Sequence, residues 1–159
     1  MSVNTTLCYI RDDRGRYLML LRNKKKNDLN EGKWVGVGGK LKACEAPDEC
    51  LLREVKEETG LTLTEYAFKG IITFVSDQWE DEQMFLYEAT GYTGELTWDC
   101  PEGELRWIPA GEILNLPLWA GDRVFLKPML EGESDIRMRL AYEGDRLADV
   151  KIFSLHTPV

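Results

Sequence analysis

The most informative part of the sequence lies between residues 38 and 60, which read GGKLKACEAPDECLLREVKEETG. The spacing predicts a helix from about Pro47 to Thr59, because Pro stands at an early helical position and Gly60 follows the end. At 100° per residue, three carboxylates share an arc of about 100° on one helix face. They belong to Glu54, Glu57 and Glu58. We expect Leu52, Val55 and Thr59, on another face, to join the core.

This clustering of negative charge is unfavourable for the helix by itself. Like charges four residues apart destabilise a helix by roughly 0.2–0.5 kcal/mol, and carboxylates near its C-terminal end oppose the helix dipole. A hard divalent cation such as Mg²⁺ resolves the conflict, because it binds carboxylate oxygens and bridges to phosphates. The alternative is a solvated acidic face. The Gly38-Gly39 pair favours the metal site, since it can adopt positive φ and let backbone carbonyls approach an ion.

The spacing of these residues resembles the Nudix box at every defined position. The order is Gly39, five residues, Glu45, seven residues, Arg53-Glu54-Val55, one residue, Glu57-Glu58, one residue, Gly60-Leu61. A pattern that specifies this many residue types over 23 positions is highly specific. The resemblance implies an α+β protein with the Nudix fold, a mixed β-sheet sandwiched between α-helices, and we expect residues 1–159 to form a single domain. It also implies Mg²⁺-dependent hydrolysis of a nucleoside diphosphate linked to another group, with Mn²⁺ as a substitute ion.

The resemblance also assigns roles to residues of the box. The implied metal ligands are the Gly38 carbonyl, Glu54, Glu57 and Glu58. Glu45 and Arg53 would hold the motif together, and Glu57 is our choice as catalytic base. In this family either a box carboxylate or a more distant Glu serves as the base, and Glu102 is the candidate for the distant carboxylate. The alternative for Glu102 is a simple turn residue before the next strand.

The likeness extends beyond the box to segments 31–34 and 118–122, which read EGKW and LWAGD. Both resemble the Nudix subgroup that hydrolyses oxidised purine nucleoside triphosphates such as 8-oxo-dGTP. This implies that Trp119 stacks on a purine and that Asp122 hydrogen-bonds the base edge. Lys25 and Thr6 are further candidate substrate contacts. The alternatives are a core Trp119 that opens a helix, an Asp122 at a capping position, and a solvated lysine loop.

Two departures leave the substrate open. Vertebrate members of the subgroup carry two adjacent Asp residues where this chain has Gly121-Asp122, and an Asn where it has Val35. A bacterial-type variant, resembling the streptococcal mutator enzymes, fits the Gly-Asp pattern better. The alternative within the family is a hydrolase of a nucleotide sugar, a dinucleoside polyphosphate or an unmodified dNTP. A non-catalytic nucleotide sensor is a further alternative, against which the complete box speaks.

Composition excludes several classes of partner. Acidic residues outnumber basic ones 28 to 20, which gives a net charge of −8. This balance argues against the basic footprint of a protein that binds nucleic-acid polymers. No secretory signal or membrane span is visible, and the four cysteines lack zinc-site spacing. We therefore expect a cytoplasmic monomer or homodimer with reduced thiols, which acts on a small-molecule nucleotide and protects the nucleotide pool from oxidised precursors.

Apolar and β-branched runs between turn residues predict the strands of the sheet. The expected strands are Thr5–Arg11, Arg16–Arg22, Ala67–Val75, Gln83–Thr90, Leu105–Ile108, Ile136–Tyr142 and Leu147–Phe153. A second helix is expected from about Gly121 to Leu130, with Pro128 distorting or ending it. Because strands outnumber helices and do not alternate with them, a mixed sheet is favoured over a doubly wound parallel one.

Overall fold

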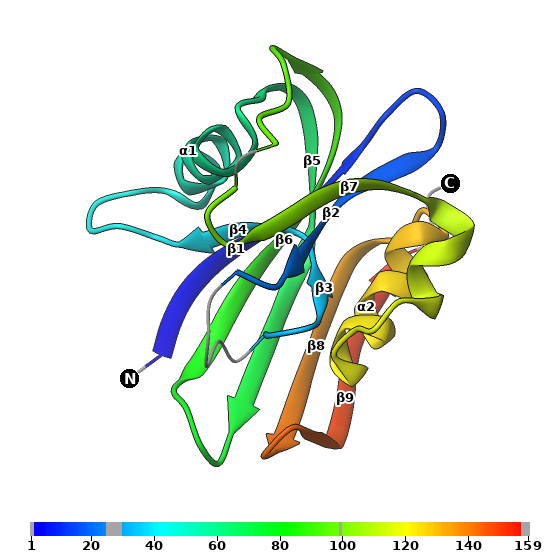
Figure 1. The fold of residues 1–159 in the computed structure, drawn as a ribbon. Coiled ribbons are helices and arrows are strands. Elements are labelled where there is room, and N and C mark those ends of the chain that lie inside the picture. The colour runs from blue at the N-terminus through cyan, green and yellow to red at the C-terminus, as the bar shows by residue number, and fades with distance from the viewer. Residues whose placement is uncertain (1, 25–29, 99, 157–159) are drawn as a thin grey trace.

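The computed structural model describes residues 2–24, 30–98 and 100–156, and within these ranges nine strands form one mixed sheet (Figure 1). The strands are β1 (Ser2–Arg11), β2 (Arg16–Arg22), β3 (Trp34–Val35), β4 (Val37–Lys40), β5 (Thr62–Ser76), β6 (Asp81–Thr93), β7 (Gly103–Pro109), β8 (Ser134–Glu143) and β9 (Arg146–His156). The helices are α1 (Pro47–Thr59), α2 (Ala120–Leu130) and a 3₁₀ helix, η1 (Ala110–Asn115). None of the helices in these ranges is long and apolar enough to cross a membrane.

The sheet runs in the order β3-β2-β1-β6-β5-β8-β9, with β4 added beside β1 and β7 beside β2. The β1–β6 and β5–β8 pairs are parallel, whereas the other pairs are antiparallel. This arrangement confirms the expected α+β fold with a mixed sheet. It also brings β1, at the start of the chain, into the middle of the sheet.

Strand β1 divides one of its edges between two partners. Its residues 5–8 pair with β4, whereas Ile10 and Arg11 pair with β2. The other edge is taken by β6 along residues 2–10. Since β2 and β4 both leave the same edge, they diverge from each other, and the candidate site lies where they do.

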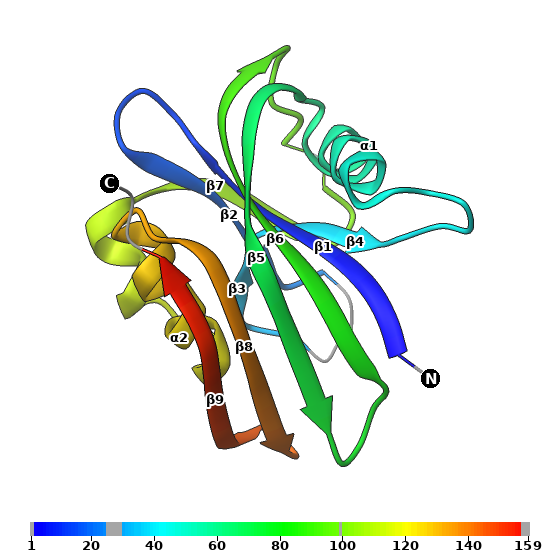
Figure 2. The same ribbon diagram turned by 180° about the vertical axis from the view of Figure 1, so that it is seen from behind.

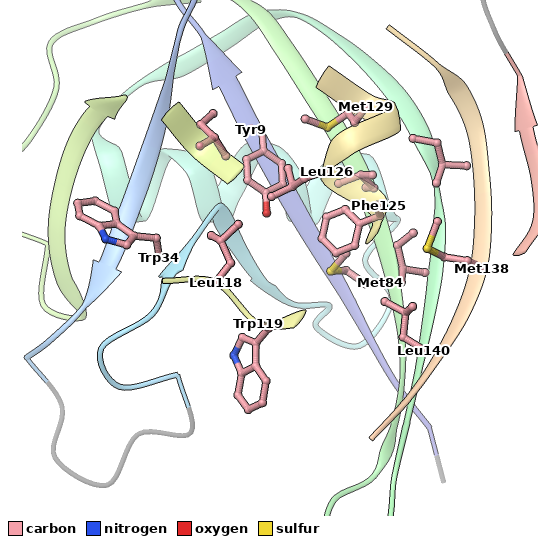
Figure 3. Packing of buried hydrophobic residues seen from close by; sticks show 14 of the residues in the cluster. Tyr9, Trp34, Met84, Leu118, Trp119, Phe125, Leu126, Met129, Met138 and Leu140 are labelled. Atoms are coloured by element: carbon pink, nitrogen blue, oxygen red, sulfur yellow. The ribbon is translucent and has the colours of Figure 1, made fainter. Parts of the chain in front are cut away.

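The two faces of the sheet carry separate apolar clusters. Along β1, Cys8 and Ile10 belong to the cluster that includes Leu51 and Val55 of α1, while Tyr9 belongs to the α2 cluster. This alternation follows from the two-residue period of a strand. Figure 1 and the reverse view in Figure 2 both show α1 and α2 on opposite sides of the molecule. Figure 3 shows the α2 cluster, where side chains of the helix meet those of β6 and β8.

Most elements confirm the expectations from the sequence. Helix α1 spans Pro47–Thr59, and Gly60 ends it with φ of 79°. The expectation for Leu52 is wrong, because its side chain is 38% exposed while Leu51, one position earlier and 100° away, is fully buried. Pro128 lies inside α2, which ends at Leu130.

The sequence did not predict β3 and β4. These short strands fall in segment 34–40, where Gly36, Gly38 and Gly39 interrupt the strand-favouring Trp34, Val35 and Val37. Their pairing with β2 and β1 therefore comes from the tertiary fold rather than from local propensity.

Gly103, in β7, allows a test of whether the pairing of β7 with β2 requires a residue without a side chain. A Cβ at this residue would lie 1.8 Å from the Leu21 carbonyl oxygen, so β7 would have to move away from β2. We expect Gly103→Ala to lower the free energy of unfolding by about 1–3 kcal/mol in denaturant titrations. Gly111→Ala is the matched control, because nothing lies within 4 Å of its added Cβ, and its effect should stay within about 0.5 kcal/mol. Equal stability of the two variants would contradict the steric argument.

Candidate active site

The guanidinium of Arg53 organises the acidic face of α1. Its Nε and Nη2 atoms donate to the two carboxylate oxygens of Glu45 at 2.7 and 2.9 Å, and Nη2 also donates to the Lys40 carbonyl at 3.1 Å. Its Nη1 atom donates to Glu54 at 2.8 Å and to Glu57 at 3.2 Å. Such paired contacts between a planar guanidinium and carboxylates are directional as well as charged. Arg53 therefore joins the loop before α1 to the helix.

Glu45 is held on the loop side of this arrangement. Besides the two bonds from Arg53, its carboxylate accepts the backbone N–H of Lys42 at 2.9 Å. The Arg53 hydrogen bonds, with the one from Lys42, lower the pKa of Glu45 to about 2. Glu45 is therefore ionised throughout the neutral range, which suits the predicted role of holding the motif together.

The Gly38-Gly39 pair is required for space rather than for positive φ. Neither residue is among the positive-φ glycines of the chain, so that expectation is wrong. A Cβ on Gly38 would lie 1.9 Å from the Thr6 carbonyl oxygen, within the β4–β1 pairing. A Cβ on Gly39 would lie 2.5 Å from the carboxyl carbon of Glu54. The glycines therefore let β4 lie close to both β1 and the acidic face of α1.

Glu58 is the buried carboxyl of the helix face. It is 9% exposed and accepts the backbone N–H of Gly38 at 3.1 Å. Burial raises its pKa, and the neighbouring carboxyls of Glu102 and Glu54 raise it further. Arg22 reaches Glu102 from β2 at 3.1 Å and offsets part of this negative charge. The structure thus brings Glu102 next to the box, although it lies over forty residues later in the sequence.

These oxygen donors fit a magnesium ion that is shared with a substrate. In the described ranges, no three acidic, cysteine or histidine side chains are placed to hold a metal on their own. Mg²⁺ usually keeps several waters and binds through one or two carboxylates together with substrate phosphates, so a complete protein cage is not needed. Burial and the nearby carboxyls of Glu54 and Glu102 raise the pKa of Glu58, and a cation bound beside it would favour the ionised form that ligates a metal. Glu57 lies farther out, with 54% of its side chain exposed.

A cavity of about 250 Å³ opens beside Glu58. Its walls include residues of β1, β2, β4, β6 and α2; β2 and β4 pair with one edge of β1, and β6 pairs with the other. Five of the residues singled out from the sequence line it: Thr6, Gly38, Glu58, Trp119 and Asp122. Small-molecule pockets usually measure roughly 300–1,000 Å³. This cavity therefore suits one ring system, with a substrate's remaining groups outside it.

Trp119 both opens α2 and lines the cavity. It is the N-cap residue of the helix, is 9% exposed, and its indole Nε1 donates to Asn30 at 2.6 Å. Trp79 and Tyr142 meet it edge to face, with ring centroids 6.3 and 5.4 Å away, and the Lys33 ammonium lies 4.9 Å from its ring centre. Figure 3 places Trp119 at the periphery of the α2 cluster. Trp119 therefore packs at the start of α2 and also forms part of the cavity wall, so the two alternatives are compatible.

Asp122 is buried at 7% exposure. Burial raises its pKa to about 7, with a contribution from the carboxyl of Glu82, while Lys33 and Arg123 oppose the rise. Arg123 itself donates to three backbone carbonyls of the segment before α2, those of Leu114, Leu116 and Leu118. It thereby holds the chain that leads into Trp119.

The two remaining predicted substrate contacts are Thr6 and Lys25. The Thr6 hydroxyl lies 3.4 Å from the thiol of Cys50, so it is engaged within the protein while it lines the cavity. Lys25, the candidate phosphate contact, lies outside the described residues. Its neighbour Lys24 donates to the Cys100 carbonyl at 2.8 Å.

The sequence reasoning missed several residues that line the cavity or support it. These are Asn30, Trp79, Glu82, Arg123 and Tyr142. Glu82 carries a signal that could have found it, because a two-residue period puts it on the same strand face as the buried Met84 and Leu86. A carboxylate in such a row is unusual and indicates a function. The others have no comparable signal, since they meet only in three dimensions.

Comparisons with known proteins agree with this geometry. A family model described as NUDIX domain matches residues 1–128. The uncharacterized Nudix hydrolase YvcI of Bacillus subtilis is 32% identical over 70% of this chain and 73% of its own length. The oxidized purine nucleoside triphosphate hydrolase of Danio rerio is 30% identical over 70% of this chain and 72% of its own. The crystal structure of a mutator MutT protein from Bacillus halodurans superimposes with a TM-score of 0.85 at 30% identity, over 94% of this chain and 97% of that one.

Arg53→Lys tests whether the guanidinium orders the acidic face. Lysine keeps the charge but cannot bind Glu45 through two parallel hydrogen bonds while also reaching Glu54. Because outer partners of metal ligands typically account for 10- to 100-fold in affinity or activity, we expect a loss of about that size in Mg²⁺ affinity and turnover. Both would be measured by titrating Mg²⁺ in a pyrophosphate-release assay.

Arg106→Lys is the control for the same change of side chain. Arg106 is exposed and reaches only Glu104, at 3.6 Å, in the contacts described for it. This variant should behave as the wild type does. If Arg53→Lys kept the wild-type dependence on Mg²⁺, the organising role of Arg53 would be wrong.

Proposed function

The chain belongs to the Nudix family, and we propose that it hydrolyses oxidised purine nucleoside triphosphates of the 8-oxo-dGTP kind to the monophosphate and pyrophosphate. One observation carries the proposal. The same cavity is lined by Gly38 and Glu58, next to the acidic helix face, and by Trp119 and Asp122, which offer a ring and a carboxyl. A metal-bound phosphate chain and a base can therefore belong to one ligand. The Danio rerio relative, which is named an oxidized purine nucleoside triphosphate hydrolase, supports the same substrate class.

The carboxylates of α1 and Glu102 would hold Mg²⁺, with the Gly38 carbonyl as a further ligand. A bound Mg²⁺ ion would neutralise phosphate charge and lower the pKa of an attacking water. Arg53 keeps Glu54 and Glu57 directed to one side of the helix by binding both. We propose Glu57 as the base that takes the proton of the water, and its exposure leaves one of its oxygens accessible for this purpose.

Basic groups beside the cavity would help to receive a phosphate chain despite the net charge of −8. Arg22 and Lys40 line the cavity on the side of β2 and β4, and Lys33 lies over the Trp119 ring. We propose that Lys25 adds a phosphate contact from the adjoining segment. On the base side, stacking on Trp119 would contribute roughly 1–3 kcal/mol. Hydrolysis of free oxidised nucleotides in this way would remove mutagenic precursors from the pool.

A second candidate is hydrolysis of unmodified dNTPs, and one observation favours it. A Cβ at Gly121 would lie 2.5 Å from the Tyr142 hydroxyl and 2.9 Å from Leu140, so α2 has no room for a second polar side chain beside Asp122. The Tyr142 hydroxyl instead accepts the Gly121 N–H at 2.7 Å. With fewer polar groups from α2, the site would discriminate less between an oxidised and a normal base.

The substrate is tested by measuring kcat/KM for pyrophosphate release from 8-oxo-dGTP and dGTP side by side, with and without Mg²⁺. We expect hydrolysis to require Mg²⁺ and to favour the oxidised nucleotide by at least about tenfold, which corresponds to one additional hydrogen bond of roughly 1.4 kcal/mol. Equal rates on both nucleotides would support the second candidate. Negligible rates on both would overturn the proposed substrate class.

The acidic face is tested with Glu57→Gln and Glu58→Gln, which keep the side-chain shape but remove the charge. We expect each variant to lower kcat by roughly 100-fold or more, because positioned bases typically contribute 10²–10⁴-fold and metal ligation needs the ionised carboxylate. Glu112→Gln, an exposed residue of η1, is the control and should retain full activity. Near-wild-type rates in both helix variants would rule out this catalytic arrangement.

A further inference from the structure

Two carboxyls outside the acidic helix face reach the same cavity from different elements. Asp122 comes from the first turn of α2, and Glu82 comes from the beginning of β6. They influence each other electrostatically, since the carboxyl of Glu82 contributes to the raised pKa of Asp122. Two acids in one cavity that binds an anionic nucleotide are unfavourable unless the ligand offers them hydrogen-bond donors.

Asp122 lacks such a donor within the protein. Among the hydrogen bonds between described residues, none ends on its carboxyl oxygens, although its backbone N–H bonds the Trp119 carbonyl at 3.0 Å. Burying a polar group without a partner costs free energy, and native structures usually satisfy such groups. Because Asp122 lines the cavity, a ligand bound there can supply the donor that the described residues do not.

The Glu82 carboxylate is anchored by a hydrogen bond within the protein but can accept further hydrogen bonds. The Thr5 hydroxyl donates to its Oε2 atom at 2.6 Å, and burial raises the pKa of Glu82, while this hydrogen bond and the charge of Lys40 on β4 oppose the rise. An ionised carboxylate has about four acceptor positions, so one hydroxyl leaves most of them available. Thr5 therefore acts as a support that orients the carboxylate from β1.

The position of Glu82 also compensates for the lack of space at Gly121. Since Tyr142 occupies the place that a side chain at 121 would need, α2 supplies only one acid to the cavity. The second acid comes from β6 instead, on the strand face that carries Met84. The cavity thus has a pair of carboxyls whose members approach from two different elements.

We propose, on the premise of the proposed function, that Glu82 and Asp122 together recognise the base, each accepting a hydrogen bond from an N–H group on one base edge. The ligand class is a nucleotide of the guanine kind, oxidised or not, because its ring N1–H stands beside an exocyclic amino group. Adenine offers an amino group beside an unprotonated ring nitrogen, so once Asp122 is ionised, above its pKa of about 7, one carboxylate would face an acceptor. A buried acceptor without a donor is costly, and sites built around such bonds discriminate strongly.

Metal-free binding of nucleoside monophosphates tests this directly. Affinities of 8-oxo-dGMP, dGMP and dAMP would be measured by isothermal titration calorimetry for the wild type and for Glu82→Gln. Glutamine can still accept the Thr5 hydroxyl but has lost the charge and one acceptor oxygen. We expect the wild type to bind both guanine nucleotides more tightly than dAMP. Glu82→Gln should reduce affinity for the guanine nucleotides by roughly tenfold or more and leave dAMP unchanged or bound more tightly.

Glu80→Gln is the matched control, because Glu80 lies exposed just before β6 and does not line this cavity. It should leave all three affinities unchanged, whereas a general disturbance of the hairpin would alter them together. The proposal is overturned if the wild type does not prefer guanine nucleotides, or if Glu82→Gln keeps the wild-type ratio of guanine to adenine affinity. Because no metal or hydrolysis is involved, these outcomes are distinct from failure of the pyrophosphate-release assay.

Discussion

The guanidinium of Arg53 is the contact on which the site depends. It binds Glu45 and the Lys40 carbonyl on the loop side and Glu54 and Glu57 on the helix side. Without a cation between them, carboxylates grouped on one helix face would repel each other and adopt other rotamers. Arg53 offsets that repulsion along one edge of the group. Glu58, which it does not bind, is left as the buried carboxyl that faces the cavity.

Close approach of backbone is the second constraint, and it connects this acidic face to the cavity. Gly39 leaves room for the Glu54 carboxyl, and Gly38 leaves room for the pairing of β4 with β1. Strand β1 pairs with β4 over residues 5–8 and with β2 at Ile10 and Arg11, so this edge changes partner near Tyr9, while Thr6 lies in the β4-paired part and lines the cavity. β1 lies between β4, which carries Gly38 beside the acidic face, and β6, which carries Glu82 on the proposed base side.

The sequence alone predicts the helix of the box and most strands, because these elements rest on local signals. Pro47 and Gly60 mark the ends of α1, and alternation marks the longer strands. It does not predict β3, which is only two residues long, or β4, whose glycines are required by neighbours distant in the sequence. For the same reason it predicts Trp119 and Asp122, which belong to a recognisable segment, but not Asn30 or Tyr142. The prediction that Leu52 is buried was wrong by one helical position, which is enough to move a residue from the core to the surface.

Placing acids on the base side of a site for polyphosphates has an electrostatic cost, and the structure limits it in two ways. Burial brings the pKa of Asp122 to about 7, so near neutral pH this carboxyl carries only part of a negative charge. Lys33 and Lys40 lie near the two acids and attract them. Repulsion of the phosphates is thereby reduced, while the oxygens remain available to the donors of a base. Under the proposed function, selectivity for the base and tolerance of the phosphate charge are compatible in one cavity because burial raises the pKa of both base-side acids and thereby weakens their charge, whereas the acids of α1 would be neutralised by the metal.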